Sequence, residues 1–291
     1  MSTTWQSDVG RLRRAVVKRP RDAFGGPESV EAQWEGLGYL ASPDPSLAVE
    51  EFDAFSRLLE GLGVELLFLP QVEDVGMDSI YARDAALVTD AGVILCRMGK
   101  SARGGEPSAQ ALAYSRWGIP VLGSIGGEGR LEGGDVVWLD ENTLAVGQGY
   151  RTNAEGISRL TALLDPTIEV VTVPLPHFRG PGDVFHLMSM LSPVDRDLAL
   201  VYSPLMPVPF RDLLLARGYT LVEVPEEEYD TLGCSVLTVA PRVCVMAEGS
   251  SETRRRMEAA GVAVHTFSGG EICLKGSGGP TCLARTLERD R

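Results

Sequence analysis

The segments Leu283-Ala284-Arg285-Thr286-Leu287 and Ala15-Val16-Val17-Lys18-Arg19 are short strand-like stretches at opposite ends of the chain. Four other strand pairs are each joined by a turn, and these two segments supply a fifth pair that is split between the termini. If they pair, the chain closes into a ring and few sheet edges stay exposed. An ordinary α/β sheet with alternating elements is the alternative, and the split pair favours the ring.

A repeated pattern of helix and strand supports the ring. Five helical patterns each lead into a short apolar strand, and the strands start roughly 40–55 residues apart, a period typical of propeller-like and solenoid repeats. The five strands are expected at 64–70, 119–123, 168–174, 219–225 and 262–267. The helices before them are expected at 46–62, 108–117, 153–164, 209–217 and 251–260.

Local signals mark the ends of these helices. Ser46 is the expected N-cap of the first helix, which has acidic residues in its early turns. Its apolar residues recur at three- and four-residue spacing, as on one face of a helix: Phe52, Phe55, Leu58, Leu59 and Leu62. Three other helices are followed by a glycine where a left-handed, helix-ending residue is needed: Gly118, Gly218 and Gly261.

A pair of strands lies between each repeat strand and the next helix. The turn-linked pairs are expected at 85–88 with 93–95, 136–139 with 143–146, 187–191 with 198–202, and 236–239 with 243–246. We therefore predict an α/β fold in which five ββαβ units form a five-bladed propeller within one domain, residues 1–291. The longest irregular stretch, 22–45, is expected to be a loop and is a candidate lid.

Composition excludes several classes of protein. The chain has 291 residues, of which 44% are hydrophobic and 23% are charged, which is an ordinary globular balance. Its net charge of −13 argues against nucleic acid and anionic membrane surfaces as partners, and mildly favours a cationic small molecule. No apolar run is long enough to span a bilayer.

The cysteines and the N-terminus favour a cytoplasmic protein. The five cysteines are odd in number and lack CxxC spacing, so a disulfide framework and a zinc site are both unexpected. The first residues show no basic segment followed by an apolar core, so we expect no signal peptide. Reduced thiols in the cytoplasm fit this pattern best.

Unusual residues occupy equivalent loops of the repeat, where each unit enters its strand pair. These loops converge on one central site in a ring of this kind. The loops are Tyr81-Ala82-Arg83-Asp84, Leu131-Glu132-Gly133-Gly134-Asp135, Gly182-Asp183-Val184-Phe185-His186, Leu232-Gly233-Cys234-Ser235 and Gly278-Gly279-Pro280-Thr281-Cys282. Four units thus contribute Asp84, Glu132, His186 and Cys282 at matching positions.

These four side chains favour one kind of chemistry. A cysteine thiolate attacks an electrophilic carbon, and a histidine moves protons and activates water. Two carboxylates would repel a developing oxyanion, but they bind a planar guanidinium through its paired N–H groups. The set therefore predicts attack by Cys282 on the central carbon of a guanidine.

The same loops resemble a known family. Tyr-Ala-Arg-Asp, Leu-Glu-Gly-Gly-Asp, Phe-His-Leu and Gly-Gly-Pro-Thr-Cys are similar, in this order, to motifs of the guanidine-modifying enzymes of the pentein fold, which include arginine deiminase, dimethylarginine dimethylaminohydrolase and the amidinotransferases. The resemblance implies a five-bladed propeller with no metal and no organic cofactor. It further implies that Cys282 is the nucleophile, that His186 is the general acid and base, and that Asp84 and Glu132 hold the guanidinium.

The resemblance also implies how substrate and product are handled. The intermediate would be a covalent thiouronium on the cysteine, and the products would be citrulline with an amine or ammonia. Arg103 and Arg151 match the arginines that hold the substrate carboxylate in the dimethylarginine hydrolases. The partner would be a small-molecule guanidine, with no nucleic acid and no membrane, and a homodimer is one option for the assembly.

One position departs from the arginine deiminase pattern. Those enzymes place an aspartate two residues after the catalytic histidine, and this chain has Met188 there. With one carboxylate fewer, a substituted guanidine fits better, so we expect a dimethylargininase-like hydrolase of arginine metabolism. Arginine deiminase, arginine dihydrolase and amidinotransferase activities remain the alternatives within the fold.

Two further readings come from other classes. The ribosome anti-association factors share the ring but bind without catalysis, and they lack the Cys, His and Glu set. A thiol protease would need only a cysteine and a histidine. The carboxylates Asp84 and Glu132 and the repeat architecture count against the protease, and the whole set favours an enzyme.

Overall fold

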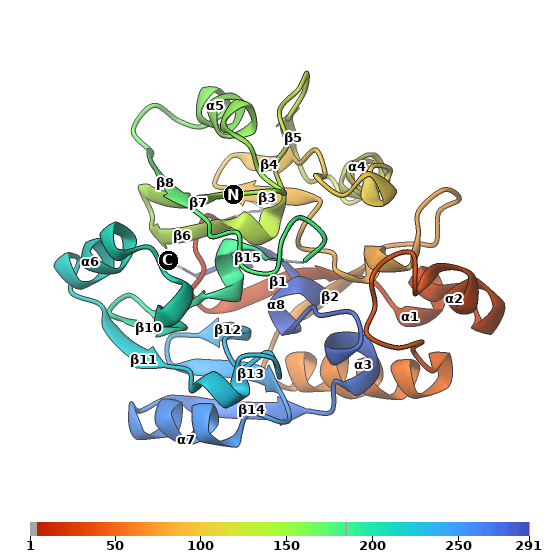
Figure 1. Cartoon of the computed structure of the whole chain (residues 1–291). Helices are drawn as coiled ribbons and strands as arrows, with labels where there is room; N and C mark the ends of the chain where they lie inside the picture. The colour runs from red at the N-terminus through yellow and green to blue at the C-terminus, as the bar shows by residue number, and fades with distance from the viewer. Residues whose placement is uncertain (1–4, 184, 291) are drawn as a thin grey trace.

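The computed structural model describes residues 5–183 and 185–290. In this part of the chain, five three-stranded sheets stand around a common centre, and the longer helices lie at the periphery (Figure 1). Each sheet contains an antiparallel pair followed, after a helix, by a third strand parallel to the second. The predicted five-bladed α/β propeller of ββαβ units is confirmed.

The sheets follow the predicted repeat. Their strands are β15 (Arg285–Arg289), β1 (Leu12–Val17) and β2 (Glu65–Phe68); β3 (Ala86–Thr89), β4 (Gly92–Leu95) and β5 (Val121–Ser124); β6 (Val136–Asp140), β7 (Thr143–Gln148) and β8 (Glu169–Pro174); β9 (Leu191–Asp195), β10 (Leu198–Val201) and β11 (Thr220–Glu223); β12 (Val236–Ala240), β13 (Val243–Ala247) and β14 (Ala263–Phe267). The main connecting helices are α3 (Pro45–Gly61), α4 (Glu106–Arg116), α5 (Ala154–Leu163), α6 (Val208–Ala216) and α7 (Ser251–Ala259).

The split fifth pair closes the ring as expected. β15 pairs antiparallel with β1, with Ala15 opposite Thr286 and Val16 opposite Arg285. β1 then pairs in parallel with β2 through Val16 and Leu67. β1 is therefore hydrogen-bonded on both edges, and β15 pairs with it along one edge.

The N-cap prediction for α3 is wrong by two residues. Asp44, not Ser46, is the N-cap, and its carboxylate accepts hydrogen bonds from the backbone N–H groups of Ser46 and Leu47. Pro45 occupies the first helical position, where its lack of an N–H costs nothing. The left-handed glycines Gly118, Gly218 and Gly261 have φ of 69°, 85° and 82°, which confirms the predicted helix ends.

The strand expected at 187–191 begins only at Leu191. Leu187–Ser189 forms a 3₁₀ turn, because side chains bind its backbone. The N–H of Leu187 donates to Asp135, and the N–H of His186 donates to the hydroxyl of Ser189. Val184, in the preceding loop, lies outside the described residues.

The stretch 22–45 is less irregular than expected. It contains the end of α1 (Pro20–Phe24) and all of α2 (Pro27–Gln33). Each helix starts on a proline, and α1 ends at Gly25 with φ of 72°. Proline commonly begins helices and glycine commonly ends them, as both do here. The expectation of a loop took these residues only as turn formers.

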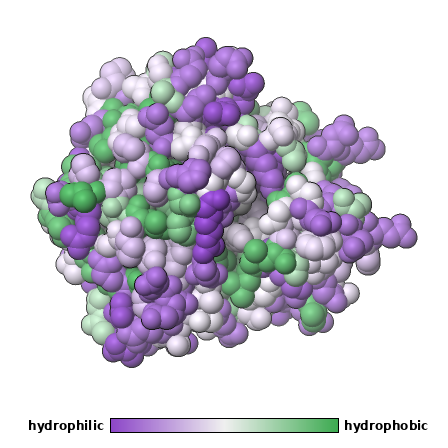
Figure 2. Space-filling model, in the orientation of Figure 1, coloured by the Kyte–Doolittle hydropathy of each residue, from purple (hydrophilic) through white to green (hydrophobic). Residues whose placement is uncertain are grey.

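Buried apolar side chains fill the spaces between sheets and helices. Val137, Leu200 and Val245, from three of the blades, have no exposed surface. The outer surface is mostly hydrophilic with scattered apolar patches, and the face in Figure 2 is hollowed near its centre. None of the helices in the described chain combines the length and apolar character needed to cross a membrane.

A charged cluster also lies inside the protein. Arg83, Arg285 and Arg289 are each at most 5% exposed, and Asp8 is the buried carboxylate whose charge acts on all three. Asp8 accepts hydrogen bonds from Arg83 (3.1 Å) and from the backbone of Trp138 (2.8 Å). Although burial opposes its charge, these arginines lower the pKa of Asp8.

We predict that Asp8→Asn destabilises the protein by about 3–5 kcal/mol, because the buried arginines lose their counter-charge. Urea unfolding followed by circular dichroism measures this difference. Asp53→Asn, on the exposed face of α3, is the matched control and should change the free energy of unfolding by less than about 0.5 kcal/mol. Equal unfolding midpoints for the two variants would contradict the prediction.

Candidate active site

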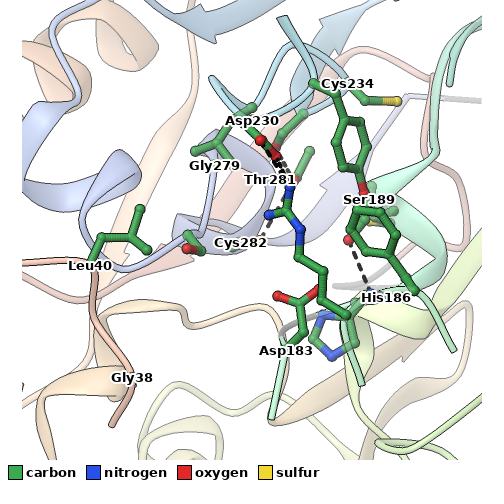
Figure 3. A pocket seen from close by; sticks show the side chains of 18 of the residues that line it. Gly38, Leu40, Asp183, His186, Ser189, Asp230, Cys234, Gly279, Thr281 and Cys282 are labelled. Carbon is green, nitrogen blue, oxygen red and sulfur yellow. Dashed lines mark hydrogen bonds and ion pairs between the residues drawn. The ribbon is translucent and has the colours of Figure 1, made fainter. Parts of the chain in front are cut away.

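Two cavities meet at Cys282 and His186. The larger encloses about 350 Å³ and opens to the surface, and Figure 3 looks into it. The smaller encloses about 30 Å³, which is room for one or two water molecules, and is lined by Asp78, Asp84 and cationic side chains. The loops of different blades thus converge on one centre, as the repeat predicted.

Glu132 is completely buried and lies behind His186. One carboxylate oxygen accepts the backbone N–H groups of Gly99 (2.8 Å) and Lys100 (3.0 Å). The other lies 2.7 Å from Nε2 of His186 and 3.1 Å from a guanidinium nitrogen of Arg151. Because these partners use both oxygens, a guanidinium substrate would have to displace Arg151 or His186 to reach them.

The two glycines after Glu132 allow this close packing. A Cβ on Gly134 would overlap the imidazole of His186, and a Cβ on Gly133 would overlap the backbone carbonyl of Arg83. The Glu-Gly-Gly sequence therefore brings the Glu132 loop against two neighbouring blades. This is the physical reason for the pattern that singled out Glu132.

Asp84 has one oxygen available in the smaller cavity. Its Oδ2 accepts a hydrogen bond from Nη1 of Arg103 at 2.6 Å. Its Oδ1 is buried and makes no hydrogen bond with any described residue. Of the two expected guanidinium-binding carboxylates, Asp84 is the one with a free acceptor beside Cys282.

The two expected carboxylate-binding arginines are both buried in ion pairs. Arg103 binds Asp84 and, through Nε and Nη2, both oxygens of Glu106 at 2.8 Å. Burial raises the pKa of Glu106 to about 7, against the pull of Arg103. Arg151 is bound to Glu132, and both arginines line the smaller cavity.

Cys282 lies in the short helix α8 (Pro280–Leu283). Its backbone carbonyl accepts the N–H of Arg83 at 3.1 Å, which connects it to the loop that carries Asp84. The preceding glycines pack on an aromatic ring, since a Cβ on Gly276 or Gly278 would overlap Tyr81. Cys282 is half-buried, whereas the other four cysteines are buried free thiols.

Cys282 and His186 have different pKa values and therefore different charges near neutral pH. Burial, reinforced by the charge of Asp84, raises the pKa of the Cys282 thiol to about 11. Burial disfavours the imidazolium of His186, but the charge of Asp135 and the hydrogen bond with Glu132 outweigh it and raise its pKa to about 9. Near neutral pH the pair is therefore a neutral thiol and a charged imidazolium.

Asp135, in the same loop as Glu132, is a further residue of the site. It is completely buried, and its carboxylate accepts the backbone N–H of Leu187 at 3.0 Å, which positions the segment carrying His186. Burial raises its pKa to about 6. Lys100 and Asp78, which form a 2.6 Å ion pair in the smaller cavity, were missed because neither lies in a recurring loop position.

Asp84, Glu132 and His186 also form the kind of cluster that could hold a metal ion. One ligand atom from each lies within 4.8 Å of the others. Both carboxylates already bind arginines, and the imidazole already binds Glu132. These cationic partners compete with a metal cation, so the geometry suits proton transfer better than metal binding.

The fold and the site together define the class: a pentein-type propeller with a cysteine, a histidine and two carboxylates at its centre. A sequence model of the arginine deiminase family matches residues 77–209 and 208–289. An N(G),N(G)-dimethylarginine dimethylaminohydrolase from Streptomyces coelicolor is 30% identical over 244 residues, covering 83% of this chain and 84% of that protein.

Solved structures agree on the fold. A DDAH mutant from Pseudomonas aeruginosa in complex with citrulline has a TM-score of 0.76 at 24% identity, covering 94% of this chain and 98% of that one. The N-terminal domain of ArgZ, a cyanobacterial arginine dihydrolase, has a TM-score of 0.79 at 21% identity in a form covalently bound to a reaction intermediate, covering 95% and 98%.

The chain belongs to the arginine deiminase family. The expected resemblance to guanidine-modifying enzymes is thereby confirmed, as is the expectation of a hydrolase of this family. The individual roles of the site residues stay predictions that follow from the geometry above.

The pKa values predict an alkaline pH profile. The reactive pair needs a thiolate together with an imidazolium, and the thiol has the higher pKa of the two. kcat/KM should therefore rise up to about pH 9, stay level, and fall above about pH 11.

Glu132→Gln removes a charge that raises the pKa of His186, so the level region should begin at lower pH. The value of kcat/KM in this level region should fall about tenfold for each unit by which the pKa of His186 decreases. Steady-state kinetics across this pH range measure both effects. A uniform loss of rate with an unchanged profile would instead mean that Glu132 only positions His186.

Proposed function

We propose that this protein hydrolyses the guanidinium group of arginine or an N-substituted arginine, with Nω-methylated arginine as the favoured substrate. The observation that carries the proposal is that Cys282, His186 and Asp84 line one cavity, and that Oδ1 of Asp84 has no hydrogen-bond partner among the described residues. The identity to the dimethylarginine dimethylaminohydrolase of Streptomyces coelicolor supports the methylated substrate.

Binding of a cationic guanidinium would activate the nucleophile. A positive charge beside Cys282 lowers the pKa of its thiol, which is otherwise too high for a thiolate near neutral pH. The free Oδ1 of Asp84 would receive N–H groups of the same guanidinium. The substrate thus brings the charge that its own attack requires.

The chemical steps balance with these residues alone. The Cys282 thiolate forms a bond to the guanidinium carbon, and the bond from that carbon to the leaving nitrogen breaks as this nitrogen takes the proton of the His186 imidazolium. The departing amine leaves a thiouronium on Cys282. The neutral imidazole then accepts one proton from water as the water attacks the thiouronium carbon. The bond from that carbon to sulfur breaks, Cys282 leaves as a thiolate, and the second proton of the water passes to solvent as the C=O bond of the ureido product, citrulline, forms.

Arg103 and Arg151 would hold the substrate carboxylate after an exchange of partners. In this conformation their ion pairs with Asp84 and Glu132 fill the smaller cavity. A guanidino acid carries both charges of such a pair, so its carboxylate can replace Asp84 on Arg103 while its guanidinium binds Asp84. The stretch 22–45 would act as the lid, since Leu37 and Gly38 line both cavities and Lys100 binds the carbonyl of Leu37.

The remaining expectations concern the whole molecule. We propose one catalytic domain over the chain, because the ring closes through both terminal strands. A cytoplasmic location is supported by cysteines that are all free thiols. A homodimer remains an option, and no metal or organic cofactor is invoked in any step.

Cys282→Ser should abolish turnover, with at least a thousandfold loss, while leaving the unfolding curve unchanged. Mass spectrometry of the wild-type protein, quenched during turnover of dimethylarginine, should show an adduct on the Cys282 peptide. Cys244→Ser, which alters a buried thiol that lines neither cavity, is the matched control and should keep its activity. Turnover of a guanidine by the Cys282→Ser variant would refute the mechanism.

Met188→Asp should shift the preference toward unmethylated arginine. Met188 is buried against the larger cavity, and a carboxylate there would bind N–H groups that a dimethylated nitrogen lacks. We expect the ratio of kcat/KM for arginine to that for dimethylarginine to increase at least tenfold. Met188→Leu controls for the change of side chain, and an unchanged ratio in Met188→Asp would show that this position does not select the substrate.

A further inference from the structure

The larger cavity holds no part of the substrate in the proposed reaction. It encloses about 350 Å³, and Cys282 and His186 form part of its wall. Arg103 and Arg151, which would hold the substrate carboxylate, line only the smaller cavity. This cavity has room for the tail only after their ion pairs with Asp84 and Glu132 have opened. A substrate bound in this way, with its guanidinium carbon at Cys282, would direct its other nitrogens toward the larger cavity.

Part of the wall of this cavity is aromatic and apolar. The ring of Phe178 lies edge-on to that of Tyr229, with centroids 5.8 Å apart, and Tyr229 in turn stacks on Tyr202 at 4.1 Å. Met188 adds a flexible apolar side chain to the same lining. Such walls bind a flat or extended apolar group through packing contacts.

The mouth of the cavity carries negative charge. Arg179 and Asp230 form an exposed ion pair at 2.8 Å, so each neutralises the other. Asp183 lines the same cavity, and its carboxylate makes no hydrogen bond or ion pair with a described residue. In Figure 3, Asp183 lies beside His186, and Asp230 lies in the upper part of the view.

We propose that the larger cavity receives the nitrogen substituent that leaves, and that this enzyme accepts guanidines whose substituent is larger than two methyl groups and aromatic or extended. This inference rests on the proposed hydrolysis of guanidines. A dimethylamino group has only three heavy atoms and fills a small part of the cavity. After C–N cleavage the departing amine takes a proton from solvent and becomes an ammonium, which the carboxylate of Asp183 would attract.

The test compares substrates on the unmodified protein. Release of citrulline and amine is followed by mass spectrometry for Nω,Nω-dimethylarginine, Nω-propylarginine and Nω-benzylarginine. We expect kcat/KM for the benzyl compound to be at least equal to that for dimethylarginine. A benzyl compound turned over at least a hundredfold more slowly would overturn the inference and leave the proposed function intact, whereas no turnover of any guanidine would overturn both.

Inhibition by the amines that the reaction releases tests whether the leaving substituent binds in the larger cavity. Benzylamine should inhibit at a concentration at least tenfold lower than dimethylamine does. Asp183→Asn should weaken inhibition by benzylamine three- to tenfold, and the matched control Asp212→Asn, on the exposed face of α6, should not change it. Met188→Trp should lower the benzyl-to-dimethyl ratio of kcat/KM at least tenfold, and equal ratios in this variant and the unmodified protein would contradict the assignment.

Discussion

The carboxylate of Glu132 joins three blades of the propeller at the centre of the site. Backbone N–H groups of Gly99 and Lys100 come from the first unit, after its strand pair, Arg151 comes from the second, and the imidazole of His186 comes from the third. Burial alone would raise the pKa of this carboxyl group, but the His186 hydrogen bond and the nearby cations lower it, so the group stays charged. The hydrogen bond that positions His186 depends on that charge, which together with Asp135 raises the pKa of the imidazole.

The nucleophile depends on a different constraint, the pairing of β15 with β1. Cys282 lies in α8, directly before β15, so its place in the ring is set by the strand that closes the sheet. A hydrogen bond from the hydroxyl of Ser235 to that of Thr281, or the reverse, at 3.0 Å connects α8 to the fourth blade. Acid-base group and nucleophile therefore come from opposite sides of the ring, and only its closure brings them together.

Sequence periodicity predicted the fold well because each blade repeats the same order of strands and helices. The recurring loop position likewise identified Asp84, Glu132, His186 and Cys282, which the structure places around one centre. Errors arose where a side chain bonds to distant backbone. The loop position did not single out Asp135, because its partner, the N–H of Leu187, lies on another blade. The ion-pair partners of Arg103 could not be predicted either, since sequence periodicity does not indicate which charged side chains lie close together.

The pairing of β15 with β1 also has a consequence for synthesis. β1 is synthesised early, but its antiparallel neighbour β15 is the last strand in chain order. One edge of β1 therefore stays unpaired until β15 has been synthesised, while β2 can pair with the other edge. Contacts between such distant segments form late, since closing a long loop is entropically costly. Cys282 reaches His186 only in that final step. The order of the chain therefore allows four of the five sheets to form before the centre that Cys282 completes.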